Sequence, residues 1–139
     1  MFLLDTHVVS ETRKPKPHDG VMKWLGAQEA SALYISAMTI AELQRGIELT
    51  RTQDALKARD IEVWLEHVMA SGQVLAMDAA VCREWARLMH ARSSTLAEDA
   101  FIAATASVHR LTVATRNVRD FKALGAHTIN PFDSNRTGA

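Results

Sequence analysis

The chain has 139 residues, 47% of them hydrophobic and 23% charged, and its 16 basic and 16 acidic residues leave no formal net charge. This length and composition predict one globular domain with its own core, and they exclude a nucleic-acid binder that relies on overall positive charge. Cys82 is the single cysteine, which excludes an intramolecular disulfide and a cysteine zinc cluster, and the lack of a signal-peptide pattern or of an apolar run of about 20 residues favours a cytoplasmic protein without a membrane span.

The predicted elements alternate between short apolar strands and amphipathic helices. In chain order they are a strand at 2–4, a loop at 13–20, a helix at 21–27, a strand at 33–36, a helix from residue 39, a helix at 52–70, a strand at 73–77, a helix capped by Asp78, a helix at 97–109, a strand at 111–114, a short helix at 119–124 and a weak strand at 127–129. This alternation predicts an α/β fold of three layers with a central, mostly parallel sheet flanked by helices. We expect one domain over residues 1–133 and a polar C-terminal tail over residues 134–139.

Helical spacing also predicts which side chains face inward. Five apolar residues share the inward face of the helix at 52–70: Ile61, Trp64, Leu65, Val68 and Met69. This is more apolar surface than one small core needs, so part of it is available to a second copy of the chain. We expect Trp24, Trp64 and Trp85 to pack in the core rather than stack on bases, and Cys82, beside Trp85, to be buried or partly buried.

Asp5 is the most informative residue because it ends the apolar run of the first strand. An unpaired buried carboxylate is costly, so such an acid needs a donor, a cation or a metal beside it. Thr115 and Asn117 follow the strand at 111–114 in the same way. Ligands of open α/β sheets bind at the carboxyl ends of the strands, so these side chains face one cleft if the two strands are neighbours.

Two helical acids can join Asp5 in that cleft. Glu42 lies in the first turns of its helix, close to the apolar face, and Asp99 opens the helix at 97–109 with apolar residues on its own face. Each position also has an ordinary structural explanation. Asp5 can cap a turn, Glu42 can be a solvated residue, Asp99 is an acid favoured at a helix N-terminus, and Asn117 is a turn former. Local spacing leaves these alternatives open.

Four segments, taken in order, resemble the PIN-domain ribonucleases, in particular the VapC toxins and their FitB-like relatives. They are LLDTHVVSE at 3–11, SAMTIAELQRG at 36–46, AEDAFIAATA at 97–106 and TVATRNVRDF at 112–121. The resemblance implies the PIN-like α/β/α fold. It also implies a metal-dependent endoribonuclease toxin of a toxin–antitoxin pair, which hydrolyses RNA phosphodiester bonds with Mg²⁺ or Mn²⁺ as cofactor.

The resemblance assigns the metal to three acids, Asp5, Glu42 and Asp99. Asn117 stands where other members of the family place a fourth aspartate, and it completes the implied catalytic set. Asp120 lies three residues later and is an alternative for the fourth acidic position. An amide in place of a carboxylate weakens the argument for a second tightly held metal.

Further residues have implied roles around this acidic set. Those that would orient ligands or water are Thr6, His7, Thr115 and Asp120. His7 stands where many relatives have Asn, and we expect it to form hydrogen bonds rather than to bind the metal. Five cations would hold RNA and restore a local positive field: Arg13, Lys14, Lys16, Arg116 and Arg119. Ordinary solvated charges are the alternative for each of them.

The implied chemistry explains why these residue types are needed. Mg²⁺ takes oxygen ligands and keeps several waters, so a few carboxylates at strand and helix ends suit it. Without the metal such carboxylates repel one another, which predicts that the pKa of one or more of them is raised. A bound metal polarises the scissile phosphate and activates a water for attack.

The resemblance also implies partners. These are the RNA substrate, a VapB-type antitoxin that packs into the toxin's groove, a second copy of the chain in a homodimer, and a higher assembly with the antitoxin. A non-catalytic PIN-like module that binds RNA or a protein is the main alternative, and Asn117 favours it. A third possibility is a phosphatase-like or 5′-nuclease enzyme that acts on other phosphoesters.

Overall fold

A five-stranded sheet forms the centre of the computed structural model, which describes residues 1–133. The strands are β1 (Phe2–Leu4), β2 (Leu33–Ser36), β3 (Gln73–Leu75), β4 (Thr112–Ala114) and β5 (Thr128–Ile129). Their order is β3-β2-β1-β4-β5, and every neighbouring pair is parallel. The predicted parallel sheet is therefore confirmed, with β1 in the middle and the carboxyl ends of β1 and β4 side by side.

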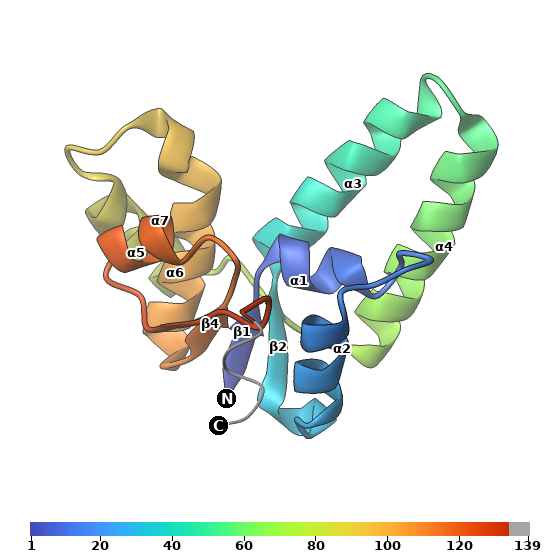
Figure 1. Cartoon of the computed structure of the whole chain (residues 1–139). Coiled ribbons are helices and arrows are strands. Elements are labelled where there is room, and N and C mark those ends of the chain that lie inside the picture. Colours follow the sequence, from blue (N-terminus) through green and yellow to red (C-terminus); the bar gives the residue numbers. More distant parts are fainter. Residues whose placement is uncertain (134–139) are drawn as a thin grey trace.

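Helices cover both faces of this sheet. They are α1 (Thr6–Glu11), α2 (Asp19–Gly26), α3 (Ala37–Arg51), α4 (Ala55–Ser71), α5 (Ala79–Met89), α6 (Ala97–His109) and α7 (Val118–Ala123), with short 3-10 turns η1 (Ala30–Ala32) and η2 (Ser94–Leu96). Figure 1 shows α5, α6 and α7 on one side of the strands and α1 to α4 on the other, where α3 and α4 project as a helical hairpin. The predicted α/β/α architecture of three layers is confirmed.

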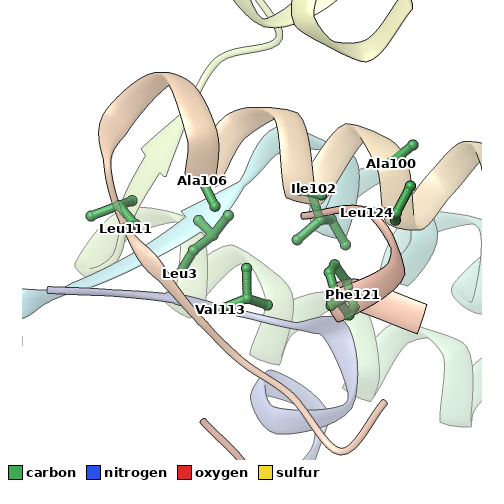
Figure 2. Close-up of a cluster of buried hydrophobic side chains, with 9 residues drawn as sticks. Leu3, Ala100, Ile102, Ala106, Leu111, Val113, Phe121 and Leu124 are labelled. Atoms are coloured by element: carbon green, nitrogen blue, oxygen red, sulfur yellow. The ribbon is translucent and has the colours of Figure 1, made fainter. Parts of the chain in front are cut away.

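Alternate residues of the strands pack against opposite helical layers, as the two-residue period of a strand requires. Leu3 and Val113 pack under α6 and α7 with Ile102 and Phe121, and Figure 2 shows these side chains gathered between the sheet and the helices. Leu4, the next residue of β1, joins the second core cluster, on the side of α1 and α2. β1 is thus buried on both faces, and its last buried residue is followed directly by Asp5.

One helix was missing from the sequence prediction. α1 starts immediately after β1, because the Asp5 carboxylate accepts a hydrogen bond from the Thr6 amide at 2.8 Å and caps the helix. The helix has only six residues and includes Thr6, Val8 and Val9, which have low helix propensity, so periodicity alone did not reveal it. α1 buries both valines and carries the chain from Asp5 toward the basic loop.

Side-chain caps set the starts of the helices that were predicted. Ser36 accepts a hydrogen bond from the Met38 amide, so α3 begins at Ala37 rather than at residue 39. Asp54 caps α4 at the Lys57 amide, so α4 begins three residues later than the expected residue 52. Asp78 accepts from the Val81 amide at 3.0 Å, which confirms it as the predicted cap of α5.

Two burial predictions were wrong. Met69 is 49% exposed, and Cys82 is exposed as well. Successive residues of a helix are about 100° apart, so Cys82 is turned well away from Val81, and Met69 lies at the edge of the apolar stripe of α4 rather than on it. Leu65, near the centre of that stripe, is buried against Ile47 of α3.

The end of the described chain belongs to the packed domain. Pro131 is buried, and Phe132 packs against the core cluster that contains Leu4 and Val8. The predicted polar tail at 134–139 lies outside the described residues. Over residues 1–133, no helix combines the length and the apolar character needed to cross a membrane.

Candidate active site

The carboxyl ends of β1 and β4 bring together two polar residues that are far apart in sequence. The Asp5 amide donates to the Ala114 carbonyl at 2.9 Å, which extends the pairing of the two strands by one residue. Directly beside this contact, Thr115 Oγ1 donates to Asp5 Oδ2 at 2.7 Å, and both residues are buried. The prediction that these strands are neighbours and that Asp5 and Thr115 meet at their ends is confirmed.

Asp5 is only 4% exposed, and each of its carboxylate oxygens accepts a hydrogen bond. Oδ1 accepts from the Thr6 amide and Oδ2 from the Thr115 hydroxyl. Both sequence interpretations of Asp5 therefore hold, since it caps α1 and also contributes a buried charge to this edge of the sheet. The two donors fix the orientation of the carboxylate.

Asn117 links the next two acids. Thr115 Oγ1 accepts from the Asn117 amide at 2.9 Å, which holds the turn after β4. Asn117 Nδ2 then donates to Asp99 Oδ2 at 3.1 Å and to Asp120 Oδ2 at 3.0 Å. The side-chain amide thus bridges two carboxylates without adding a negative charge of its own, and it ties the start of α6 to the start of α7.

Glu42 reaches the same edge from α3. Thr6 Oγ1 lies 3.2 Å from Glu42 Oε1 and 3.2 Å from Thr39 Oγ1, and its one proton can be donated to either at a time. Glu98 lies near enough to act on Glu42 electrostatically, and it forms an ion pair with Arg45 at 2.8 Å. The start of α1 and the first turns of α3 are thereby joined beside Asp5.

The charges of this acidic cluster, defined as Asp5, Glu42, Asp99 and Asp120, act on one another. Burial raises the pKa of Glu42 to about 7, and the charges of Glu98, Asp5 and Asp99 add to the rise while the Thr6 hydroxyl opposes it. Burial also raises the pKa of Asp99 to about 6. The charges of Asp5 and Asp120 add to the rise, and the hydrogen bond from the Asn117 side chain opposes it. This agrees with the expectation that close carboxylates without a metal repel one another.

These shifts make the stability of the metal-free protein depend on pH. The folded-state pKa of Glu42 and of Asp99 lies above the unfolded value, so their contribution is present at low pH and is lost as pH rises through about 6 and 7. We expect the melting temperature to be about 2–4 °C higher at pH 5 than at pH 8, since solvent screening limits each half-exposed acid to about 1 kcal/mol or less.

Differential scanning fluorimetry in a chelating buffer measures how the melting temperature changes between pH 5 and pH 8. The double variant Glu42→Gln/Asp99→Asn serves as the control, and its melting temperature should vary less over the same range. A wild-type protein that melts at a lower temperature at pH 5 than at pH 8, with no difference from the double variant, would contradict the expectation.

The donor set of the cluster fits a hard cation. Within residues 1–133, no three histidine, cysteine or acidic side chains lie close enough to enclose a metal ion by themselves. Mg²⁺ is commonly held by one or two carboxylates and retains several waters, so it does not need such an enclosure. Besides burial, neighbouring carboxylates raise the pKa of Glu42 and of Asp99, and a divalent cation at this edge of the sheet would offset that negative charge.

The residues predicted to surround the acids are placed as follows. The His7 side chain is exposed on α1 and forms no hydrogen bond or ion pair within residues 1–133, so its positioning role stays a prediction. Arg13, Lys16, Arg116 and Arg119 are exposed, as RNA-binding cations must be.

Lys14 differs from the other cations because it is already paired. Its ammonium group forms an ion pair with the carboxylate of Glu11, which is 4% exposed. Sequence reasoning gave Glu11 no role. The available signal was the i, i+3 spacing of an acid and a lysine across the end of a short helix.

The fold and the acidic strand ends together define a class of protein. Residues 2–126 match the PIN domain family model, and the chain therefore belongs to the PIN-domain family.

Within this family the chain is similar over nearly its whole length to VapC and FitB proteins. It is 39% identical to VapC ribonuclease Y4jK of Sinorhizobium fredii, over 96% of this chain and 99% of the relative. It is 35% identical to Toxin FitB of Neisseria gonorrhoeae, over 95% of this chain and 99% of the relative. The crystal structure of FitAcB from Neisseria gonorrhoeae superposes with a TM-score of 0.83 at 34% identity and covers 95% of this chain and 99% of that one.

Proposed function

We propose that the protein is a metal-dependent endoribonuclease toxin that hydrolyses RNA phosphodiester bonds with a metal-activated water. The observation that carries the proposal is the convergence of Asp5, Glu42 and Asp99 at the carboxyl ends of β1 and β4, with the pKa of Glu42 and of Asp99 raised there. The relatives named VapC ribonuclease and Toxin FitB support the same activity.

Asp5, Asp99 and Glu42 would hold the ion, Mg²⁺ or alternatively Mn²⁺. When bound, the metal would supply Lewis acidity and lower the pKa of a water ligand, which hydrolysis of a phosphodiester requires. The chain's own contribution is orientation. Thr115 and the Thr6 amide fix both oxygens of Asp5, and Asn117 holds Asp99 toward Asp120.

RNA would be held by exposed cations on both sides of the turn after β4 and in the loop after α1. Arg116 and Arg119 flank Asn117, while Arg13 and Lys16 lie in the loop. Because the chain has no net charge, this local field would account for RNA affinity, and binding should weaken as salt rises.

The direct test is cleavage of a labelled RNA by the purified protein. We expect cleavage that requires Mg²⁺ or Mn²⁺, stops with a chelator and yields 5′-phosphate ends, with at least about tenfold slower turnover of single-stranded DNA or of a small phosphate ester. Cleavage that persists in excess chelator would contradict the metal mechanism. Preferential hydrolysis of the small ester would favour the phosphatase-like alternative.

A non-catalytic PIN-like module remains the second candidate, and Asn117 is the feature that favours it because it replaces an acid by an amide. Expression in a bacterium separates the two functions. Growth arrest that is lost in both Asp5→Asn and Asp99→Asn supports the enzyme, whereas arrest that persists in both supports a binding module.

We also propose that the protein acts in the cytoplasm with a VapB-type antitoxin, as a homodimer and in a higher assembly with that partner. Exposed apolar side chains on the α3–α4 hairpin, Leu49, Leu56, Val63 and Met69, offer surface for such contacts. Light scattering of the chain alone and with the product of the neighbouring gene would measure both assemblies.

A further inference from the structure

Glu11 is a buried acid that lies outside the acidic cluster. It ends α1, whose first residue follows Asp5, and it is 4% exposed. Burial of an unpaired carboxylate is costly, so its two oxygens need partners. Oε2 pairs with the Lys14 ammonium group, and Oε1 accepts from the His18 amide at 2.9 Å.

These two contacts close the segment 12–18, which connects α1 and α2 (Figure 1). The beginning of the segment is held by Trp64 Nε1, which donates to Thr12 Oγ1 at 3.1 Å. The end is held by His18, whose Nδ1 accepts from the Val21 amide and caps α2. Glu11 is the group that binds the middle of the segment to its end.

Arg116 completes the arrangement from the turn after β4. Its backbone lies between Thr115, which binds Asp5, and Asn117, which binds Asp99. Its guanidinium group lies 4.7 Å from the centre of the Phe132 ring, and the His18 ring lies 5.1 Å from that ring on centroids. The Lys14 ion pair lowers the pKa of Glu11, with the charge of Arg116 among the further causes, so the acid is ionised beside both cations.

We propose that Glu11 is a positioning residue that fixes the segment 12–18 and the Arg116 side chain at one flank of the acidic cluster, and so sets how tightly RNA is held rather than how fast it is cleaved. This inference rests on the proposed ribonuclease function. Charge and positioning predict opposite effects of a Glu11 substitution on RNA affinity. Removal of an acid near a polyanion should tighten binding if charge alone matters, whereas loss of a positioning residue should weaken it.

Steady-state kinetics on RNA distinguish these two effects. For Glu11→Ala we expect KM to rise about tenfold, as for the loss of one charge-assisted hydrogen bond, with kcat changed less than about twofold. Glu11→Gln retains an acceptor for the His18 amide and the side-chain volume, so its KM should rise by less. Glu84→Gln removes a similar i, i+3 ion pair, to Arg87 on α5, and should leave both constants unchanged.

Limited trypsin digestion reports on the same segment without using catalysis. Lys14 and Lys16 are each followed by proline, which blocks cleavage, so the segment offers trypsin only the bond after Arg13. We expect this bond to be cut about tenfold faster in Glu11→Ala than in the wild type or in Glu84→Gln, while the melting transition stays cooperative. Should the alanine variant fail to fold, the isosteric Glu11→Gln carries the test.

Two results would overturn the proposal. One is a KM that is unchanged or lower in folded Glu11 variants, and the other is a fall in kcat at constant KM. A wild-type protein that cleaves no RNA would refute the ribonuclease function instead, and the rate of cutting after Arg13 would then still decide whether Glu11 fixes the segment.

Discussion

The Asp99→Asn variant is expected to lose metal-dependent RNA cleavage by at least about 10³-fold, because a bound metal supplies several kcal/mol of transition-state stabilisation. Burial raises the pKa of Asp99, and the charges of Asp5 and Asp120 add to the rise. The substitution keeps the volume of the side chain and removes one of the negative charges that would hold the cation. Single-turnover cleavage of labelled RNA with excess enzyme measures the loss directly.

The same substitution should not unfold the protein. Since burial and, after it, repulsion raise the pKa of Asp99, removal of this carboxylate relieves an unfavourable charge, and the metal-free variant should melt at the wild-type temperature or above. Asp60→Asn, on the exposed side of α4, is the matched control and should keep full activity. Cleavage within tenfold of the wild type in a folded Asp99→Asn would remove Asp99 from the metal-binding set.

This opposition between activity and stability is a consequence of how the cluster is built. Its carboxylates approach one another because strand ends and helix starts bring them there. The Thr6 amide, the Thr6 and Thr115 hydroxyls and the Asn117 side chain donate hydrogen bonds to them. Active sites often hold such unfavourable charge, which the rest of the fold must offset. The protein therefore depends on the core beneath the cluster to keep the acids together.

Sequence reasoning located the strands because each is a short apolar run, and it placed the functional edge because parallel strands share their carboxyl ends. Asp5 and Thr115 could be paired in advance for that reason, 110 residues apart. α1 could not be predicted, since its six residues have weak helix propensity and its start depends on one side-chain cap. The helices α3 and α4 start at other residues than predicted for the same reason. Caps such as Asp54 are local side-chain contacts, and hydrophobic periodicity carries no information about them.

The surroundings of the site were harder to predict than its acids. Lys14 reads as one more free cation in a basic loop, yet the loop folds back so that Lys14 meets Glu11. Asn117 was identified by position, but its bridge between Asp99 and Asp120 depends on the turn geometry after β4. Contacts that cross a loop are set by its three-dimensional path, and spacing along the chain carries little information about it.

The Phe121→Ala variant is expected to lose about 3–5 kcal/mol of the free energy of unfolding, which is much of the about 5–15 kcal/mol typical of a small domain. Phe121 is fully buried in the core cluster with Leu3, Ile102 and Val113 (Figure 2), so truncation leaves a cavity under α7.

The loss of stability should also affect the acidic cluster, because α7 carries Asp120 and follows Asn117, which donates a hydrogen bond to Asp99. Urea denaturation followed by circular dichroism measures the loss, with Arg83→Ala as control. Arg83 is exposed on α5, and its truncation should change stability by about 0.5 kcal/mol or less. A Phe121→Ala variant that loses less than about 1.5 kcal/mol, with an unchanged dependence on urea, would show that α7 does not depend on this contact. Asp120 and Asn117 would then be held by their hydrogen bonds rather than by the packing of Phe121.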